Sequence, residues 1–428
     1  MIIKFIISDY NYHGGAQKTA NLAEFLQSSG HNVEIIVLRS RSGDIESRPK
    51  HFTNILDLNA NGLFSSIFKL IKIFKHFESD IFISVGSYSN LSAGLAKLLS
   101  RRTIPIIGSE NFAKSVLIGD YPKPYFRLLL PLFKLANTQL NGILFVSEKL
   151  RIEFLKKNFW HPARCVTIYN PVRSLKKIKA ERNINNKKNS GITFLGVGVL
   201  EQRKRFDLLL ESFSLIARPN DRLLIAGTGS LRNELKTLAV KLGIYSKVKF
   251  LGYVSDIESL MKKSDVLVLT SNSEAFGMVL AEGLAAGLQV VSTNSFSGPA
   301  EVLGNGRYGF LAEVDNVKSI SSSMKAAIDS PISKEMIYEG ASRFSANSIV
   351  KKYLNFIAVV TESEFSLFKP LKNERKAKRI LINVSVITKV YRGMAVFTKQ
   401  IVRELIKNDN YEYIFVTGND LDDEITQL

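Results

Sequence analysis

Two glutamates lie eight residues apart in the stretch SNSEAFGMVLAEGLAAGLQVVST, residues 271–293. Glu274 stands in a Phe-Gly turn after an apolar strand pattern, and Glu282 falls one turn into the helical pattern behind it. Unpaired amides at a helix start favour phosphate, and a carboxylate beside them suits the hydroxyl pair of a ribose. The spacing is equally consistent with an acid that favours the helix dipole and a second acid exposed to solvent.

Three further glycine-containing turns follow strand patterns and could contribute to the same site. In GVGVLEQRKRFDLLLESF, residues 196–213, Arg203, Lys204 and Arg205 could neutralise a diphosphate leaving group, although this stretch alone favours a solvated basic loop. The others are AGTGSL, residues 226–231, and YHGGAQK, residues 12–18, whose paired glycines let a backbone approach a phosphate. Four such turns at the carboxyl ends of strands indicate one shared crevice.

The elements that must position these turns are strands alternating with helices. Strand patterns such as IIKFIIS, DIFISVG and GILFVSE recur in the first half, and ITFLGVG, RLLIAGTG and DVLVLTS in the second. This rhythm predicts an α/β fold with two Rossmann-like, doubly wound domains that face each other across a cleft. The boundaries we expect are a first domain over 1–173, a basic linker over 174–190, a second domain over 191–345, a closing helix and linker over 346–370, and a further α/β segment over 371–428.

Composition restricts the class of protein. The 428 residues are 45% apolar, with one cysteine, Cys165, and a net charge of +19. A single cysteine excludes an internal disulfide framework and fits a reducing cytosol, and no apolar run reaches the length of a membrane span. The basic charge favours polyanionic partners, which include phosphorylated small molecules and anionic lipid headgroups. The five histidines have no metal-ligand spacing, and DLD at 420–422 resembles a metal-binding aspartate pair only by chance.

The quoted motifs resemble the family-4 retaining glycosyltransferases with the GT-B fold. The resemblance runs from the first residues to about Ile357 and includes GGAQKTANLAEFL, VTIYNPV, LLIAGTGSLRNEL and SEAFGMVLAEGLAAGLQVVSTNSFSGPAEVL. The pair of glutamates with seven residues between them is its most specific element. The best match is to bacterial enzymes that build lipopolysaccharide, capsule or lipid-linked oligosaccharides.

The resemblance implies a nucleotide-sugar donor, with UDP-sugar expected, held mainly by the second domain, and a glycan or lipid-linked acceptor on the first. It implies no metal, no other cofactor and no nucleic acid partner. Lys204 would contact the donor diphosphate, with Arg203 beside it, Glu274 would orient the donor sugar and Glu282 would bind the ribose. The other donor-side residues are Gly15, Tyr253, Val254, Phe276, Gly277 and Met278.

Two departures from the family pattern keep an alternative open. Val199 stands where the family usually has arginine after the glycine of the turn, and Ser109, Glu110 and Asn111 stand where an acceptor-side histidine or SERN-type segment is common. A catalytically impaired, basic binding subunit therefore remains an alternative. A nicotinamide-dependent oxidoreductase is a weaker one, because no G-x-G-x-x-G follows the first strand.

One helix pattern in the first half bears on localisation. In LFSSIFKLIKIFKHF, residues 63–77, Ile67, Leu70 and Phe74 share an apolar face with Leu63, Ile71 and Phe77, and Lys69, Lys72 and Lys75 lie largely opposite. This pattern fits a helix on an anionic membrane surface, and it fits a helix packed on its own sheet at least as well. We expect a cytoplasmic protein, with peripheral binding to the inner face of the cytoplasmic membrane as the further hypothesis.

The last segment resembles the opening of the chain. At a constant offset of 379, Gly14 corresponds to Gly393, Leu26 to Leu405 and Val37 to Val416. This correspondence predicts that a strand, a glycine loop, a helix and a second strand begin again after Lys378.

Overall fold

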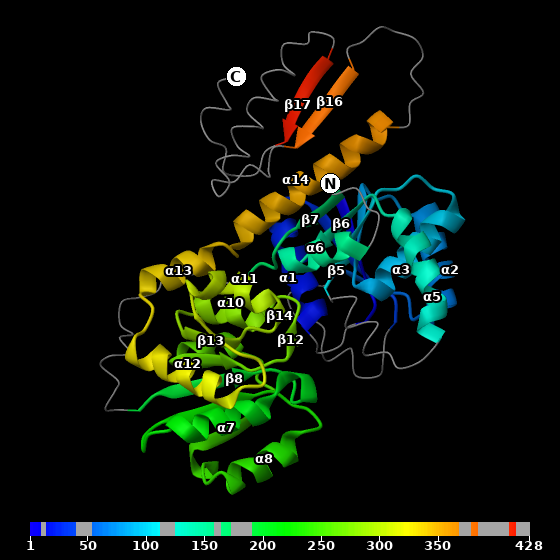
Figure 1. Cartoon of the computed structure of the whole chain (residues 1–428). Coiled ribbons are helices and arrows are strands. Elements are labelled where there is room, and N and C mark those ends of the chain that lie inside the picture. The colour runs from blue at the N-terminus through cyan, green and yellow to red at the C-terminus, as the bar shows by residue number, and fades with distance from the viewer. Residues whose placement is uncertain are drawn as a thin grey trace. The chain divides into compact units, whose positions relative to one another are not determined.

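The computed structural model describes residues 1–9, 14–39, 54–111, 125–157, 164–172, 191–367, 378–383 and 411–416. These residues form two units, Met1–Glu364 and Phe365–Leu428. The first unit contains two parallel sheets with helices on both faces (Figure 1). The predicted α/β fold with two Rossmann-like halves is confirmed.

The first sheet has seven parallel strands in the order β3-β2-β1-β4-β5-β6-β7. They are β1 (Ile2–Ile7), β2 (Asn32–Val37), β3 (Ile55–Asp57), β4 (Ile81–Val85), β5 (Ile106–Glu110), β6 (Gly142–Phe145) and β7 (Cys165–Thr167). The helices between them are α1 (Gly14–Ser28), α2 (Leu63–His76), α3 (Ser87–Ser100), α5 (Tyr125–Thr138) and α6 (Glu148–Lys157). The strand order reverses between β1 and β4, and the carboxyl ends of parallel strands at such a reversal are where ligands usually bind.

The second sheet has six parallel strands in the order β10-β9-β8-β11-β13-β15. They are β8 (Thr193–Val197), β9 (Arg222–Ala226), β10 (Val248–Gly252), β11 (Val266–Leu269), β13 (Gln289–Thr293) and β15 (Phe310–Ala312). Its helices are α7 (Phe206–Ile216), α8 (Arg232–Lys241), α9 (Ile257–Lys262), α10 (Met278–Ala285), α11 (Gly298–Val302), α12 (Val317–Asp329) and α13 (Lys334–Ser342). Short 3-10 turns are η3 (Gln202–Lys204), η4 (Tyr245–Lys247) and η5 (Gly304–Gly306).

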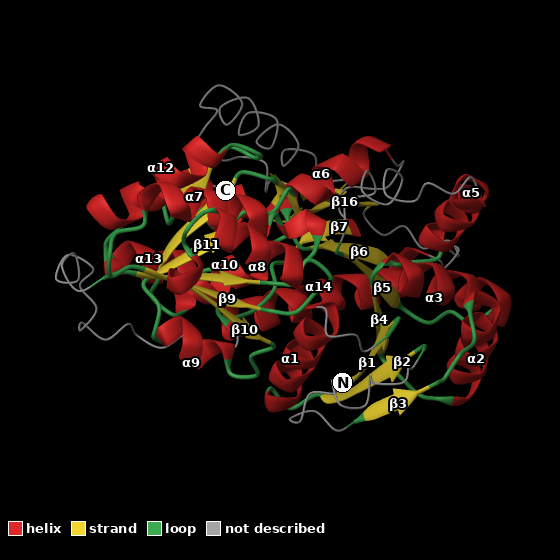
Figure 2. Ribbon diagram, turned by 90° about the horizontal axis from the view of Figure 1, so that it is seen from below, coloured by secondary structure: helices red, strands yellow, loops and turns green. Residues whose placement is uncertain are grey.

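The strands are continuous apolar runs because helices cover both faces of each sheet. Figure 2 shows the sheets with these helices around them. Within β1, Ile3 and Ile6 are fully buried, and Phe194 and Leu195 of β8 are equally buried in the second sheet. The short strands β3, β7 and β15 escape prediction from the sequence, since three residues carry too little periodic pattern.

The long helix α14 (Ala346–Leu367) follows the second sheet in sequence and packs against the first sheet. Its buried residues Tyr353, Phe356 and Val360 share a core with Phe5 of β1 and Leu144 of β6. A Cβ on Gly142 would lie 2.6 Å from the Phe356 ring, so this contact is close. The chain therefore returns to its first half, and α14 joins the two halves of the first unit.

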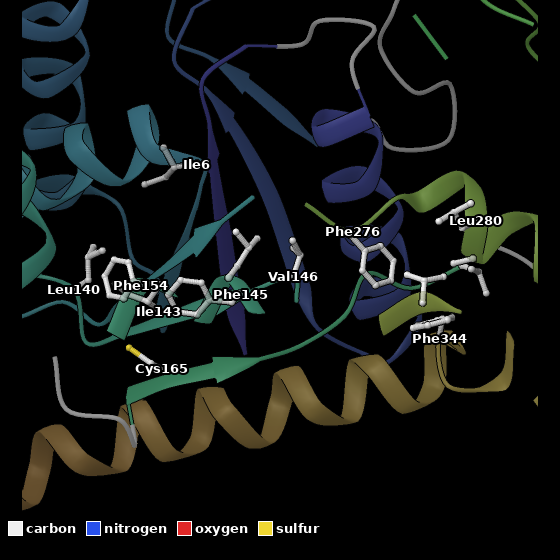
Figure 3. Packing of buried hydrophobic residues seen from close by; sticks show 14 of the residues in the cluster. Ile6, Leu140, Ile143, Phe145, Val146, Phe154, Cys165, Phe276, Leu280 and Phe344 are labelled. Carbon is white, nitrogen blue, oxygen red and sulfur yellow. The ribbon is translucent and has the colours of Figure 1, made fainter. Parts of the chain in front are cut away.

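A buried cluster also runs between the two halves of the first unit. Phe276, which precedes α10, stacks on Tyr169 with 5.6 Å between ring centroids and meets Phe344 edge-on at 5.4 Å. Figure 3 shows Phe276 and Phe344 at one end of this cluster and Phe145 and Cys165 at the other. The turn that carries Glu274 is thus anchored by an aromatic side chain in a core shared with the first half.

The second unit contains one parallel pair, β16 (Lys378–Asn383) and β17 (Tyr411–Val416). Lys378 pairs with Tyr411 as Ile2 pairs with Asn32, so the pairing repeats that of β1 with β2. At the offset of 379, β17 corresponds to β2 residue for residue, whereas β16 begins three residues before the counterpart of Ile2. Gly393 and Leu405 lie outside the described residues.

Candidate functional site

The turn that carries Glu274 contains one strand of a small two-stranded sheet. Glu274 belongs to β12 (Ser273–Glu274), which pairs in parallel with β14 (Phe296–Ser297). Gly277 then adopts a left-handed conformation with φ 81° and begins α10, a conformation that glycine adopts without strain. A Cβ on Gly298 would lie 2.3 Å from the backbone of Phe276, so glycine is required for this close approach. Both flanks of the turn are therefore fixed by backbone packing.

Lys204 and Arg203 bring positive charge to Glu274. The Lys204 ammonium donates a hydrogen bond to Oε1 of Glu274, and Nη1 of Arg203 lies 3.5 Å from the same oxygen. Nη1 of Arg203 also donates to the carbonyl of Ser273 at 2.8 Å. Burial acts to raise the pKa of the Glu274 carboxyl, but these two cations outweigh it and hold that pKa below its usual value. Glu274 is therefore an ionised acceptor beside two cations.

The third cation of the loop points elsewhere. Arg205 forms ion pairs with Asp207 and Asp315, and its backbone turns with φ 48° between η3 and α7. The stem of Lys204 passes over Gly198, where an added Cβ would lie 3.4 Å from its Cε. Arg205 therefore fixes the loop, while Arg203 and Lys204 face the glutamate.

The glycine turns after β8 and β9 pack against each other. A Cβ on Gly227 would lie 1.8 Å from the carbonyl oxygen of Gly198, and a Cβ on Gly229 would lie 2.3 Å from that of Leu200. These glycines are needed for the contact between turns, whatever else they bind. Val199 lies between Gly198 and Leu200, and its carbonyl accepts a hydrogen bond from the amide of Glu201 at 2.9 Å.

Glu282 lies in α10 and is mostly buried. Burial raises the pKa of its carboxyl, and the charge of Lys18 acts against that rise. Lys18 belongs to α1 of the first sheet, so the site draws on both halves of the first unit. The sequence reasoning missed Lys18, although it lies in the quoted YHGGAQK one turn after Gly14.

Lys18 interacts with both glutamates. Burial lowers the pKa of its ammonium, although the charges of Glu274 and Glu282 both act to raise it. Arg203 and Lys204 contact Glu274 directly, and the charge of Lys18 acts on both carboxylates. Such a group can hold the oxygens of a diphosphate and the hydroxyls of a sugar.

The remaining donor-side residues differ in their place in the fold and in their exposure. Met278 is the first residue of α10, directly after Phe276 and Gly277. Gly15 lies in the first turn of α1. Tyr253 follows β10 with 67% of its surface exposed, whereas Val254 packs partly against the core.

The three acceptor-side residues differ in where they point. Glu110 is buried, and its carboxylate accepts hydrogen bonds from Ser87 at 2.8 Å and from Asn90 at 2.9 Å, both on α3. Ser109 and Asn111 instead line a small pocket together with Lys18. Glu110 thus has hydrogen-bond partners within the fold. Its neighbours Ser109 and Asn111 line a pocket with Lys18, the lysine on which the charges of Glu274 and Glu282 act.

A carboxylate from the second half caps a helix of the first half. Glu301 of α11 accepts hydrogen bonds from the amides of Glu148 and Lys149, both at 2.8 Å, at the start of α6. Ser297 lies 2.5 Å from Ser147, oxygen to oxygen. Glu301 belongs to the quoted SGPAEVL, but the sequence gives no sign that its partner lies more than a hundred residues away. This contact fixes the two halves near the site.

Two searches of the described residues gave negative results. In the part of the chain that the structure describes, no group of three or more histidine, cysteine or acidic side chains is arranged to hold a metal ion. Among the same residues, no helix is long and apolar enough to cross a membrane. The DLD at 420–422 lies outside the described residues.

Comparisons with known proteins agree with this architecture. Residues 12–174 match the family described as Glycosyltransferase Family 4, and residues 177–344 match the family described as Glycosyl transferases group 1. The chain is 26% identical over 376 residues to an N-acetylgalactosaminyltransferase of Campylobacter jejuni, covering 84% of this chain and 99% of that protein. The full name of that relative is GalNAc-alpha-(1->4)-GalNAc-alpha-(1->3)-diNAcBac-PP-undecaprenol alpha-1,4-N-acetyl-D-galactosaminyltransferase.

Solved structures show the same fold. HepE of Anabaena, in complex with UDP and glucose, superposes with a TM-score of 0.69 at 17% identity, covering 84% of this chain and 100% of that one. The lipopolysaccharide outer core galactosyltransferase WaaB superposes with a TM-score of 0.68 at 21% identity, covering 84% and 99%. The fold is therefore GT-B. Taken with the two family matches, it shows that this chain is a GT-B glycosyltransferase related to enzymes that act on lipopolysaccharide and lipid-linked oligosaccharides.

Proposed function

We propose that the chain transfers a sugar from a UDP-sugar to a glycan or lipid-linked acceptor. The configuration at the anomeric carbon is retained. The reaction serves the synthesis of a cell-surface polysaccharide such as lipopolysaccharide or capsule. The observation that carries the proposal is the ionised Glu274 between Lys204 and Arg203, with Glu282 one turn further along α10. The UDP bound to HepE and the undecaprenol-linked acceptor in the name of the Campylobacter relative support the choice of substrates.

The proposed chemistry uses positive charge and positioning rather than a side-chain nucleophile. The bond between the anomeric carbon and the donor diphosphate breaks while the acceptor oxygen attacks from the same face. The acceptor proton passes to the released diphosphate oxygen. Lys204 and Arg203 stabilise the charge that grows on that diphosphate, where preorganised cations act most strongly. Glu274 accepts hydrogen bonds from the sugar, and Glu282 from the ribose.

We also propose that no metal ion or other cofactor is required. The three cations Lys18, Arg203 and Lys204 supply the positive charge that a metal would otherwise bring to the diphosphate. Transfer that persists in EDTA supports this, and loss of activity that Mg²⁺ restores contradicts it.

The membrane attachment that we propose uses a face of α2 that differs from the one the sequence pattern indicated. Ile67, Leu70 and Phe74 are buried in the core, so that face packs on the protein itself. Phe64 and Phe68 are instead exposed by 78% and 64%. We propose that this outer face binds an anionic membrane surface on the cytoplasmic side, near a lipid-linked acceptor.

Neighbouring helices extend that exposed face. α2 packs against α3, and α3 against α5 (Figure 1, Figure 2). Leu99 of α3 and Leu135 of α5 are exposed by 60% and 43%, and the exposed Arg101 and Lys134 lie on or beside the same two helices. Exposed apolar side chains interspersed with cations are typical of an interfacial surface.

The experiment that tests the function is direct. The purified full-length chain is incubated with a panel of UDP-sugars and an undecaprenyl-diphosphate-linked oligosaccharide. Released UDP and product are measured, and the new anomeric configuration is read by NMR. Retention supports the proposal, and inversion contradicts the mechanism. Donor binding without turnover would favour the impaired binding subunit, for which Val199 is the argument.

A further inference from the structure

We propose that the small pocket lined by Lys18, Ser109, Asn111 and Asn170 binds a phosphate-type oxyanion of one substrate. We call it the Asn170 pocket; its other walls are Phe5, Thr19, Leu22, Val85, Pro171 and Tyr353. The proposal rests on the proposed function, because the UDP-sugar donor and an acceptor linked to a lipid diphosphate both carry phosphate. It adds a subsite on the first half of the unit, apart from the loop of Lys204.

The first argument is an amide without a partner. Asn170 follows β7 and is only 8% exposed, and its Nδ2 has no hydrogen-bond partner among the described residues. A buried donor left unpaired costs free energy, which native proteins rarely accept without a reason. The amide of Asn141 is the contrast, since its oxygen accepts from Ile106 at 2.9 Å and from Lys97 at 2.8 Å. The free donor of Asn170 fits a ligand oxygen.

The second argument is that the described lining of the pocket does not balance the positive charge of Lys18. Among the described residues that line the pocket there is no carboxylate, and the glutamates that interact with Lys18 belong to the second half. Burial lowers the pKa of Lys18 even against both glutamates. A bound oxyanion would therefore stabilise the charged ammonium from the side that now lacks a counter-charge.

The third argument is the shape and place of the pocket. Val85 ends β4 and Ser109 lies one residue before the end of β5, so the pocket opens where parallel strands place ligands. Its cavity volume is about 20 Å³, a little more than one water molecule needs, so it admits a single oxygen of a group whose remainder lies outside the pocket. Phe5, Leu22 and Pro171 make part of its wall apolar, and this strengthens each hydrogen bond inside it. Burial also raises the pKa of Tyr353, so its hydroxyl stays protonated.

The primary test measures inorganic phosphate binding to the full chain by calorimetry, together with the unfolding temperature. Asn170→Leu keeps the size of the side chain and removes the donor. We expect phosphate affinity to fall about tenfold, while the unfolding temperature without phosphate rises, because an unsatisfied polar group is removed. Asn141→Leu is the matched control. It should lower the unfolding temperature, because two hydrogen bonds are lost, and leave phosphate affinity unchanged.

Lys18→Met provides a second variant that does not depend on the behaviour of Asn170. It should also weaken phosphate binding by about tenfold or more, since a charge-assisted bond is lost. Lys97→Met, which removes a lysine paired with Asn141, should not weaken it. Phosphate affinity equal to that of the wild type in both Asn170→Leu and Lys18→Met overturns the proposal, and so does a pocket that binds water only.

Competition distinguishes the two sources of the oxyanion. If UDP displaces inorganic phosphate and UMP does not, the pocket takes the distal phosphate of the donor. If phosphate and UDP bind together, the pocket takes a phosphate of the acceptor. Failure of this inference is separate from failure of the proposed function, because sugar transfer by the wild-type chain is measured independently. A chain that transfers sugar but binds phosphate equally well in all variants refutes the subsite alone.

Discussion

Lys204 and Arg203 both reach the same oxygen of Glu274, but they do so differently. The Lys204 side chain is 14% exposed and donates directly, whereas that of Arg203 is 43% exposed and lies 3.5 Å away. A less solvated cation stabilises developing charge more strongly, because water screens it less. Lys204 should therefore matter more for the chemical step.

Replacement of Lys204 by alanine should lower kcat by about a hundredfold, because the charge on the departing diphosphate loses its nearest cation. The dissociation constant of UDP should change much less, since Arg203 and Lys18 remain. Steady-state kinetics and calorimetry measure the two effects. Lys262→Ala is the control, because Lys262 forms an exposed pair with Glu258 far along the chain from this loop. Wild-type kinetics in Lys204→Ala would remove this residue from the site.

Glu282 should show a conflict between stability and binding. Burial raises the pKa of its carboxyl above the value of about 4.3 in an unfolded chain. Between these two values the folded protein binds more protons, so the stability that this group contributes falls as pH rises through the window. Above this window the buried carboxylate is ionised, and that contribution is lost.

At pH values above its raised pKa, Glu282→Gln should therefore raise the unfolding temperature, and it should weaken UDP binding, because the neutral amide is easier to bury but accepts ribose hydrogen bonds less well. The difference in stability should vanish at pH values below the unfolded pKa. Thermal unfolding between pH 4 and pH 8 and UDP titration measure both effects. The exposed Glu258→Gln should change neither. A lower unfolding temperature above the raised pKa would contradict this account of Glu282.

At the scale of the elements, the sequence pattern of α2 predicted some features of this helix and not others. The pattern identified the helix and its buried face correctly, because Ile67, Leu70 and Phe74 recur at helical spacing. It could not show that Phe64 and Phe68 remain exposed, since that depends on where α3 packs. Nor could it show that Lys69 donates to the carbonyls of Leu58 and Asn59 at 2.6 and 2.9 Å, which gives this lysine a structural role.

Replacement of Phe64 and Phe68 by serine together with Lys72 and Lys75 by glutamate should abolish sedimentation with vesicles that contain anionic lipid. The first pair supplies exposed apolar surface and the second exposed charge on the same stripe of α2. Transfer to a water-soluble acceptor should stay at the wild-type level. Lys262→Glu and Lys318→Glu, on the second half, form the charge-matched control. Unchanged vesicle binding would show that α2 is not the membrane face.

The donor elements were predictable because each lies within one continuous stretch, in which strand, turn and helix follow one another. Glu274, Lys204 and Glu282 could therefore be singled out as candidates from these turns and from the family resemblance. Lys18, Asn170 and Glu301 could not, because their partners come from segments far away in the sequence. Only the fold brings α1 to the glutamates, or α11 to the first turn of α6.

At the scale of the whole molecule, the described contacts that close the first unit come from residues before the end of α14. Phe344 accepts a hydrogen bond from Val172 at 2.9 Å, and Glu301 caps α6. Along α14, the buried side chains run from Ile349 to Val360. All the residues of the proposed donor site and of the Asn170 pocket precede this point, so the second unit supplies none of them.

A chain that ends at Leu367 should therefore keep the fold, the UDP affinity and the transfer rate of the full-length protein. The strand pair β16–β17 belongs to a separate unit, in whose described residues it repeats the β1–β2 pairing of a first half. A shorter chain that ends at Ile349 is the contrast. It loses Tyr353, Phe356 and Val360 from the core of the first sheet, and it should unfold at a markedly lower temperature because several large apolar side chains are removed. Thermal unfolding and donor hydrolysis, measured on both chains, check the two expectations. If the chain that ends at Leu367 unfolds or loses transfer, then residues after α14 complete the first unit, and the division at Glu364 does not describe an independent enzyme.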